Sequence, residues 1–283
     1  MGRLAVINGK TLPPDEAVVS VYDRGFLYGD TVFETLRTYG GKLYALDEHV
    51  RRLEHSAHEL AIQLPIERDV LARETSDAVS AAGNVDSHCR IILSRGSGPV
   101  GLDPSAAAKP MRVILVEPLP PLDSVLYEEG IAAICVQTIR ASDAAHSAKL
   151  GNYVASVLAL RDAKAAGARE ALVVNRDGMV VEGTTANLFA VREGELVTPP
   201  LDAGVLAGIT RSVVIEVALA QGLNVRYAAY SPEALIDSEE LFLTSSIREL
   251  VPVVRVDGHT IAAGMPGKIT QMLHAAFRRR VGA

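Results

Sequence analysis

Residues 147–156 read Ser-Ala-Lys-Leu-Gly-Asn-Tyr-Val-Ala-Ser and place Lys149 just before an apolar stretch, 154–166, that is typical of a helix. A lysine amine in such a small-residue, apolar setting loses water. This loss disfavours the charged amine and makes the neutral form a better nucleophile toward an aldehyde. The alternative is an ordinary surface lysine on a helix. Of the six lysines in the chain only Lys149 has this setting, so we expect it to take part in chemistry.

A glutamate follows 33 positions later (182 − 149), in the run 180–189, Val-Val-Glu-Gly-Thr-Thr-Ala-Asn-Leu-Phe. A lysine and a buried acid are what pyridoxal phosphate requires. The lysine holds the aldehyde of the cofactor as a Schiff base. The acid keeps the pyridine nitrogen protonated, so that the ring can accept electrons. The alternative for Glu182 is a charged residue that simply ends a hairpin.

The phosphate of this cofactor needs cations and backbone amides around it. The run 206–211 leads into a helix, so the amides of Ile209 and Thr210 lie at a helix N-terminus. The run 243–246, Leu-Thr-Ser-Ser, ends a strand in hydroxyl groups. An ordinary helix start with a threonine cap remains the alternative for the first of these runs.

Length and composition favour an intracellular enzyme of two domains. At 283 residues with 48% apolar side chains, the chain can build two cores. No apolar run reaches the roughly 18 residues of a membrane span, and no signal peptide begins the chain. A net charge of −6 gives no reason to expect nucleic-acid binding. Two isolated cysteines and seven histidines without metal-ligand spacing predict no disulfide, no metal site and a cytoplasmic location.

The order of predicted elements gives an α+β domain over residues 1–117. Hairpins turn at Asn8-Gly9 and Gly40-Gly41. Asp47 is expected to cap a helix with an apolar stripe from Leu46 to Leu64, and a second helix covers 67–82. Strands follow at 89–94 and 111–116. The proline-rich run that starts at Pro118 predicts a linker over 118–130.

Residues 131–283 are expected to form the second domain. A strand at 131–137 precedes Lys149, and two hairpins follow, 171–182 and 187–198. Helices are predicted at 210–221 and 266–280, on either side of strands at 240–244 and 252–256. The run 96–101 fits G-x-G-x-x-G, but 102–104 reads as loop where a dinucleotide site needs a helix. We therefore expect a flexible loop there.

These motifs, together with Asp23–Asp30 (Asp-Arg-Gly-Phe-Leu-Tyr-Gly-Asp), follow one another in the order found in a known family. The chain resembles the fold-type IV pyridoxal-phosphate enzymes: branched-chain aminotransferases, D-amino-acid aminotransferases and aminodeoxychorismate lyases. The resemblance implies a smaller N-terminal α+β domain and a larger C-terminal mixed, β-barrel-like domain with helices. It also implies a homodimer whose site lies at the interface, with the segment from Tyr28 to Glu34 reaching the partner's pocket. The alternative is that the rings of this segment belong to their own domain's core.

The resemblance implies a role for each matching residue. Lys149 is the catalytic residue, and Arg52, rather than its neighbour Arg51, is the phosphate arginine. The residues expected to bind the cofactor are Lys149, Glu182, Arg52, Tyr153, Ile209, Thr210, Ser245 and Ser246. The residues expected to bind the substrate are Arg90, Phe33, Tyr28 and Ile247. Arg90 is the candidate for the substrate carboxylate; a structural arginine is the alternative, with Arg24 or Arg248 as next candidates.

The features that would select one reaction within the family conflict. Val100 and Leu102 stand where D-amino-acid aminotransferases carry an Arg-x-His pair, which counts against a D-specific enzyme. Arg90 and the run 151–153 resemble branched-chain enzymes, but the four positions from Lys149 to Tyr153 are closer to the other two groups. We expect a transaminase that moves an amino group between an amino acid and a 2-oxo acid such as 2-oxoglutarate or pyruvate. Branched-chain L-amino acids are the first expectation and D-amino acids the second. The alternative is an aminodeoxychorismate lyase that makes 4-aminobenzoate for folate synthesis.

Overall fold

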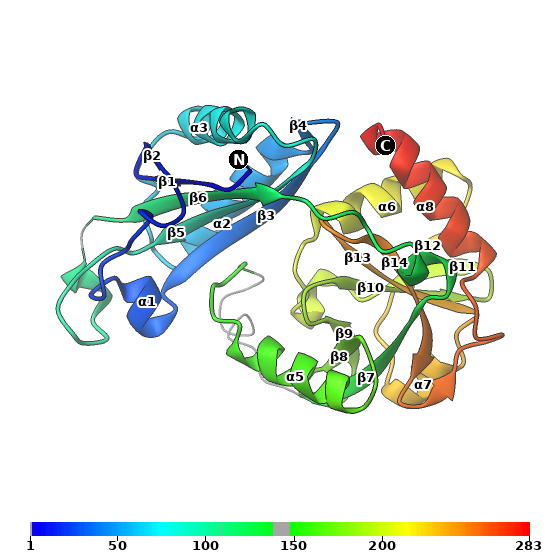
Figure 1. Ribbon diagram of the computed structural model, residues 1–283. Helices are drawn as coiled ribbons and strands as arrows, with labels where there is room; N and C mark the ends of the chain where they lie inside the picture. Colours follow the sequence, from blue (N-terminus) through cyan, green and yellow to red (C-terminus); the bar gives the residue numbers. More distant parts are fainter. Residues whose placement is uncertain (1, 108, 138–147) are drawn as a thin grey trace. The chain divides into compact units, whose positions relative to one another are not determined.

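The computed structural model describes residues 2–107, 109–137 and 148–283, which form two compact units (Figure 1). The first unit contains the described residues of 2–120 and 148–152, and the second contains those of 121–137 and 153–283. The segment that carries Lys149 thus packs with the first unit. The domain limits at 117 and 131 stay predictions.

The first unit is built on a six-stranded antiparallel sheet in the order β2-β1-β6-β5-β3-β4. The predicted hairpin at Asn8-Gly9 is confirmed. Both turn residues have positive φ (50° and 85°), as a two-residue hairpin turn requires. The strands are β1 (Leu4–Ile7), β2 (Lys10–Leu12), β3 (Thr31–Tyr39), β4 (Lys42–Leu43), β5 (Ser87–Ser94) and β6 (Met111–Pro118). β6 includes Pro118, which we had assigned to the linker.

Helices α2 (Leu46–Glu59) and α3 (Arg68–Ala82) cover one face of this sheet (Figure 1). Strand side chains alternate between faces, and those that point to the helices build the core: Val32, Leu36, Cys89, Ile91 and Leu93. The predicted stripe of α2 is confirmed, because Val50, Leu53 and Ala57 are buried in that core. The predicted cap is wrong, since Ala45 precedes the helix and no side chain caps it.

Lys149 lies in an extended segment and not on a helix. Leu150 pairs with Val32 of β3. The Phe33 N–H donates to the Lys149 carbonyl (3.1 Å) and the Gly151 N–H donates to the Thr31 carbonyl (2.8 Å). Only then does α5 (Val154–Ala165) begin. The backbone of the lysine is therefore fixed as an added edge of the first unit's sheet.

The second unit contains a closed ring of six strands, in the order β10-β13-β14-β7-β8-β9, which returns to β10 through the pair Glu182↔Asn187. This confirms the expected barrel-like domain. The ring strands are β7 (Ile131–Gln137), β8 (Glu170–Val174), β9 (Val180–Gly183), β10 (Asn187–Arg192), β13 (Glu240–Ser245) and β14 (Glu249–Val256). Short strands β11 (Glu195–Thr198), β12 (Val225–Tyr227) and β15 (His259–Thr260) extend it.

Helices α5, α6 (Ile209–Ala220) and α8 (Lys268–Val281) pack on the ring, α5 against β8 and the other two against β13 and against each other (Figure 1). The short helices α1 (Arg24–Tyr28), α4 (Val125–Glu128) and α7 (Pro232–Ile236) were not predicted. Among the described residues, no helix is both long enough and apolar enough to cross a membrane.

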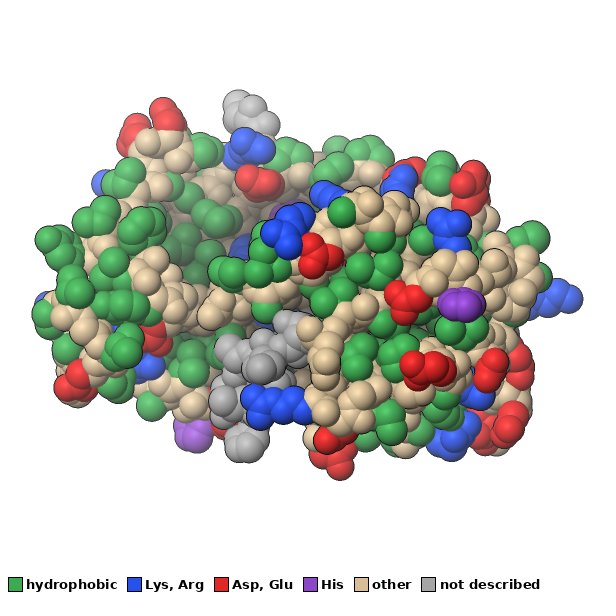
Figure 2. Space-filling model, turned by 90° about the horizontal axis from the view of Figure 1, so that it is seen from below, with side chains coloured by type: hydrophobic (Ala, Val, Ile, Leu, Met, Phe, Trp, Pro, Cys, Tyr) green, Lys and Arg blue, Asp and Glu red, His purple; other side chains and the backbone are tan. Residues whose placement is uncertain are grey.

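The first unit exposes a group of large apolar side chains on two adjoining segments, 18–27 and 100–102. The segments are joined by backbone hydrogen bonds from Arg24 to Gly96 (2.9 Å) and from Gly98 to Tyr22 (3.3 Å). Figure 2 shows hydrophobic side chains, in green, gathered at this end of the unit. We call these residues the apolar patch: Val18, Val19, Val21, Tyr22, Phe26, Leu27, Val100 and Leu102.

Candidate active site

In the first unit, Lys149 and Arg90 meet at one aromatic ring, that of Phe33. The Arg90 Cζ lies 3.8 Å from the ring centroid and the Lys149 Nζ lies 4.7 Å from it. Phe33 is 2% exposed, so the ring is held in place. Thr35, two residues along β3 and thus on the same face, pairs with Arg90 on β5. The sheet therefore presents an amine and a guanidinium together on the face opposite α2 and α3.

On the other face, Glu34 joins β3 to Arg52 and His49 on α2. The Arg52 Nε and Nη2 each donate to one oxygen of the Glu34 carboxylate at 2.7 Å, and His49 Nδ1 lies 2.6 Å from that carboxylate. Burial would raise the pKa of Glu34, but Arg52 and His49 outweigh it and lower this pKa to about 2. Burial lowers the pKa of His49. Arg52 is thereby held in a fixed orientation, whereas Arg51 is exposed, as predicted.

The same helix also holds the lysine segment. The Lys149 N–H donates to the Ser56 Oγ at 3.0 Å. Ser56 follows Arg52 by one helical turn, so the two side chains lie on the same side of α2. The structure thus brings together three of the predicted residues, Lys149, Phe33 and Arg90, and places Arg52 on the helix that anchors them.

In the second unit, the acid and the start of α6 are joined through Leu206. The Leu206 N–H donates to the Glu182 Oε2 (3.3 Å), and the Asn187 Nδ2 donates to the Leu206 carbonyl (2.8 Å). Glu182 is 4% exposed. Gly208, directly before α6, has no room for a side chain, because an added Cβ would lie 1.9 Å from the Asn187 Oδ1. The structure therefore groups Glu182 with Ile209 and Thr210, the first two residues of α6.

The turn after β13 lies next to this group, because Thr244 pairs with Asn187. Ser245 ends the strand and accepts a hydrogen bond from the Arg248 N–H (3.3 Å), and Ser246 and Ile247 are half-buried in the turn. Thr244 is 2% exposed, and its Oγ1 has no hydrogen-bond partner among the described residues. A buried hydroxyl of this kind, a helix N-terminus and a glycine pressed against its neighbour fit a bound phosphate group.

Two further predicted residues stand at the ends of helices. Tyr153 is the residue before α5 and is half-buried in the second unit. The Tyr28 hydroxyl accepts a hydrogen bond from the Gly101 N–H at 2.9 Å. The expected segment from Tyr28 to Glu34 is not a loop, since Tyr28 ends α1 and β3 starts at Thr31. Phe33 is buried in its own unit, which favours the core alternative for this ring.

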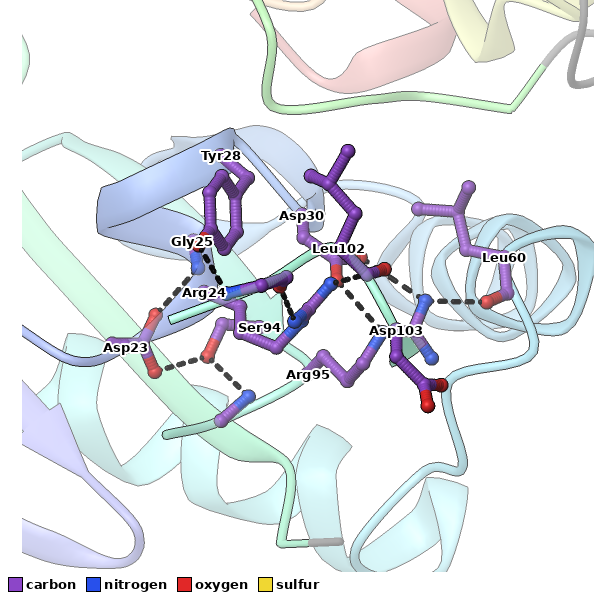
Figure 3. Close-up of polar contacts among 12 residues, drawn as sticks. Asp23, Arg24, Gly25, Tyr28, Asp30, Leu60, Ser94, Arg95, Leu102 and Asp103 are labelled. Atoms are coloured by element: carbon purple, nitrogen blue, oxygen red, sulfur yellow. Dashed lines mark hydrogen bonds and ion pairs between the residues drawn. The ribbon is translucent and has the colours of Figure 1, made fainter. Parts of the chain in front are cut away.

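The two other candidate arginines are engaged by the protein itself. Arg24 is 3% exposed, pairs with Asp30 (Nε to Oδ2, 2.9 Å) and donates to the carbonyls of Gly101 and Leu102 at 2.8 and 3.2 Å (Figure 3). These bonds tie down the loop that we had expected to be flexible. The Arg248 Nη2 donates to the Glu170 carboxylate at 2.8 Å.

The sequence reading missed Glu34, His49 and Glu170. Each is buried and each is hydrogen-bonded through its side chain. The only signal in the sequence was a charged or polar residue inside an apolar strand or helix face, which usually marks a paired group.

The comparisons with known proteins identify relatives along the whole chain. The family model described as "Amino-transferase class IV" matches residues 31–256. A relative from Methanocaldococcus jannaschii, provisionally named a branched-chain-amino-acid aminotransferase, is 39% identical over 96% of this chain and 94% of its own. The D-alanine aminotransferase of Bacillus licheniformis is 30% identical, with 98% and 96% covered. The aminodeoxychorismate lyase of Bacillus subtilis is 29% identical, with 97% and 94% covered.

The fold has relatives of the same kind. The branched-chain aminotransferase of Thermoproteus uzoniensis, solved with norvaline, superposes with a TM-score of 0.91 at 30% identity, over 99% of this chain and 95% of that one. The branched-chain amino acid aminotransferase of Thermobaculum terrenum, solved in its PLP-form, superposes with a TM-score of 0.87 at 28% identity, over 99% and 94% of the two chains. The similarity thus extends over both units.

Proposed function

Because the chain belongs to the class IV aminotransferase family, we propose that it is a pyridoxal-phosphate-dependent transaminase acting on amino acids and 2-oxo acids such as 2-oxoglutarate or pyruvate. Branched-chain L-amino acids are its favoured donors and D-amino acids the second choice. The observation that carries this proposal is the shared Phe33 ring, whose centroid lies 3.8 Å from the Arg90 Cζ and 4.7 Å from the Lys149 Nζ. An α-amino acid presents a carboxylate and an amine one carbon apart.

Arg90 is the residue that we assign to the substrate carboxylate. A planar guanidinium binds a carboxylate through two parallel hydrogen bonds. Phe33 supports the guanidinium from one side. Tyr28 and Ile247 remain substrate residues on the strength of the family resemblance.

The cofactor assignments use both groups of residues. Arg52, the amides of Ile209 and Thr210, and the hydroxyls of Ser245 and Ser246 would hold the phosphate, with Tyr153 as a further contact. Glu182 would pair with the pyridine nitrogen and keep it protonated. When bound, pyridoxal phosphate supplies a ring that accepts electrons from the substrate α-carbon. The buried Thr244 hydroxyl and the close approach of Gly208 to Asn187 support a phosphate site at this end of α6.

Lys149 would carry out the proton transfer. Its amine would hold the cofactor, and its Nζ, when free, would accept and return the α-proton of the substrate. The Ser56 hydroxyl and the pairing with β3 fix the backbone from which this side chain extends.

A homodimer in the cytoplasm completes the proposal. The apolar patch of the first unit supports the dimer, because exposed groups of large apolar side chains mark interaction sites, and a second copy of the chain would cover this one. Two cysteines without a disulfide fit a reducing compartment. Size-exclusion chromatography with light scattering would test the dimer, and a monomer at micromolar concentration would contradict it.

Two measurements test the reaction. Borohydride reduction followed by peptide mapping should place the cofactor on Lys149; label on Lys164 or Lys268 would overturn the assignment. A donor panel with both enantiomers of each amino acid and 2-oxoglutarate should show transamination, greatest for branched-chain L-amino acids. Absence of transamination together with release of 4-aminobenzoate from aminodeoxychorismate would make the enzyme the lyase instead.

A further inference from the structure

A buried ion pair joins two turns of the second unit. Glu170, on β8, is 1% exposed. Its carboxylate accepts hydrogen bonds from the N–H and the hydroxyl of Thr184, in the turn that directly follows Glu182. Its other oxygen accepts from the Arg248 Nη2 at 2.8 Å, in the turn that follows Ser245 to Ile247. One carboxylate thus links the turn after the acid to the turn of hydroxyl residues.

The two turns differ in what else holds them. The Thr184 turn has two further bonds: the Ser156 hydroxyl donates to the Thr184 carbonyl (3.2 Å), and the Gly183 N–H donates to the Ala186 carbonyl (2.7 Å). Glu182 itself is bonded to Leu206. This side therefore stays in place if Glu170 is changed.

The turn of Ser245 to Arg248 is closed by the β13–β14 pair Ser245↔Glu249, and Arg248 connects it to other parts of the unit. The Tyr127 hydroxyl donates to the Arg248 carbonyl at 2.9 Å, and the Arg248 Nη2 donates to Glu170 at 2.8 Å and to the Thr185 Oγ1 at 3.4 Å. The rest of the turn is half-buried. A carboxylate this deeply buried needs a charged partner, so the pair fixes the direction in which the turn leaves β13.

We propose that Glu170 and Arg248 are positioning residues that set the Ser245–Ser246 hydroxyls at the distance from Glu182 that the cofactor phosphate requires. The proposal rests on the proposed function. It predicts a specific defect, because loss of the pair removes the link that directs the phosphate turn toward the Thr184 turn, while Glu182 keeps its bond to Leu206. Residues that orient direct ligands typically change binding by about tenfold to a hundredfold.

The test compares two ligands on the full-length protein after removal of its cofactor: pyridoxal phosphate, and pyridoxal, which lacks the phosphate. Glu170→Gln and Arg248→Met should each weaken the binding of pyridoxal phosphate by about tenfold. The affinity for pyridoxal should stay within about twofold of the wild-type value. The double variant should be no weaker than Arg248→Met, because that single variant already lacks the bond between Glu170 and Arg248. Arg226→Met is the matched control. Arg226, whose side chain is 42% exposed, forms an ion pair with Glu195 in the same unit. Its loss should leave both affinities unchanged.

Equal weakening of both ligands, or unchanged binding of pyridoxal phosphate in Arg248→Met, would overturn the proposal and make the pair merely structural. If Glu170→Gln fails to fold, the Arg248 variants carry the test, since this side chain is 29% exposed. Arg248→Lys should fall between Met and wild type. A wild-type protein that binds no pyridoxal phosphate at all would instead refute the proposed function, so the two failures are distinguishable.

Discussion

Glu34 orients Arg52 in the first unit, although its only mark in the sequence is a charge within an apolar strand. It is 0% exposed and binds Arg52 through both carboxylate oxygens. Its partners lie 15 and 18 positions away in the chain, on a helix that packs on its strand. Lys149 and Glu182 could be proposed as candidates because the chemistry expected of them shows in neighbouring residues. Glu34 could not, because its role depends on the register of α2 over β3.

Arg90→Leu tests the carboxylate assignment at the scale of one residue. An arginine–carboxylate contact contributes on the order of 1.5–3 kcal/mol, so kcat/KM for an amino acid should fall by about tenfold to a hundredfold. The loss should appear mainly in KM, since the contact is made in the ground state and the transition state alike. A primary amine without a carboxylate is the control donor and should be affected far less. Equal losses for both donors would make Arg90 a structural arginine.

At the scale of elements, the segment 148–152 lies along the sheet only because β3, far away in the sequence, pairs with Leu150. Periodicity predicted α2, α3 and the hairpins, whose residues are neighbours in sequence. It could not predict the pairing of Leu150 with Val32, because that pairing is decided by the sheet edge that β4 leaves open. For the same reason the parallel pairs of β7 with β8 and β14 were not predicted.

Gly151→Ala should displace the lysine segment. An added Cβ at this position would lie 1.8 Å from the Thr31 Oγ1, a contact that β3 must yield to. We expect a loss of about 1–3 kcal/mol in the free energy of unfolding and a lower kcat, because the Lys149 backbone is bonded to the same strand. Thermal unfolding and steady-state kinetics measure both. Adding Thr31→Ala removes the clashing oxygen and should restore much of both quantities; a double variant no better than Gly151→Ala would contradict this.

Arg24→Met tests whether one side chain holds the loop 96–103 on α1. The variant loses the hydrogen bonds to Gly101, Leu102 and Asp30 (Figure 3). Amide hydrogen exchange should become faster in this loop and stay unchanged in α2. Arg51→Met, on an exposed arginine, is the control and should leave the loop protected. Unaltered exchange in Arg24→Met would show that the Tyr28 hydroxyl and the backbone bonds suffice.

For the whole molecule, stability should fall in mild acid because of His49. Burial keeps its folded pKa below the ordinary value of 6.5. As the pH falls through 6.5 the unfolded chain takes up a proton while the folded protein does not, so the free energy of unfolding decreases. Glu34 adds to this loss only in stronger acid, between 4.5 and about 2. The melting temperature of His49→Gln should therefore vary less than that of wild type between about pH 7.5 and pH 5.5. An identical dependence in both proteins would contradict the assignment.

The division into two parts could be predicted from the sequence, whereas the closed ring of strands could not. Chain length, the prolines after β6 and the family resemblance indicated an α+β part and a barrel-like part. The ring itself could not be derived from local pattern. It closes through Glu182 and Asn187, which are close in the chain but whose pairing depends on the other four strands of the ring being in place.

That closure has a consequence for colloidal behaviour. β9 and β10 share one paired position, whereas β10 and β13 share five. The contact between β9 and β10, the seam of the ring, is therefore where two strand edges would first be uncovered. Uncovered edges recruit other chains into aggregates. Glu182 stands at this seam and also bonds to Leu206. A substitution there can lower the yield of protein through aggregation as well as through lost chemistry, and turbidity on storage is a separate quantity from turnover in any such variant.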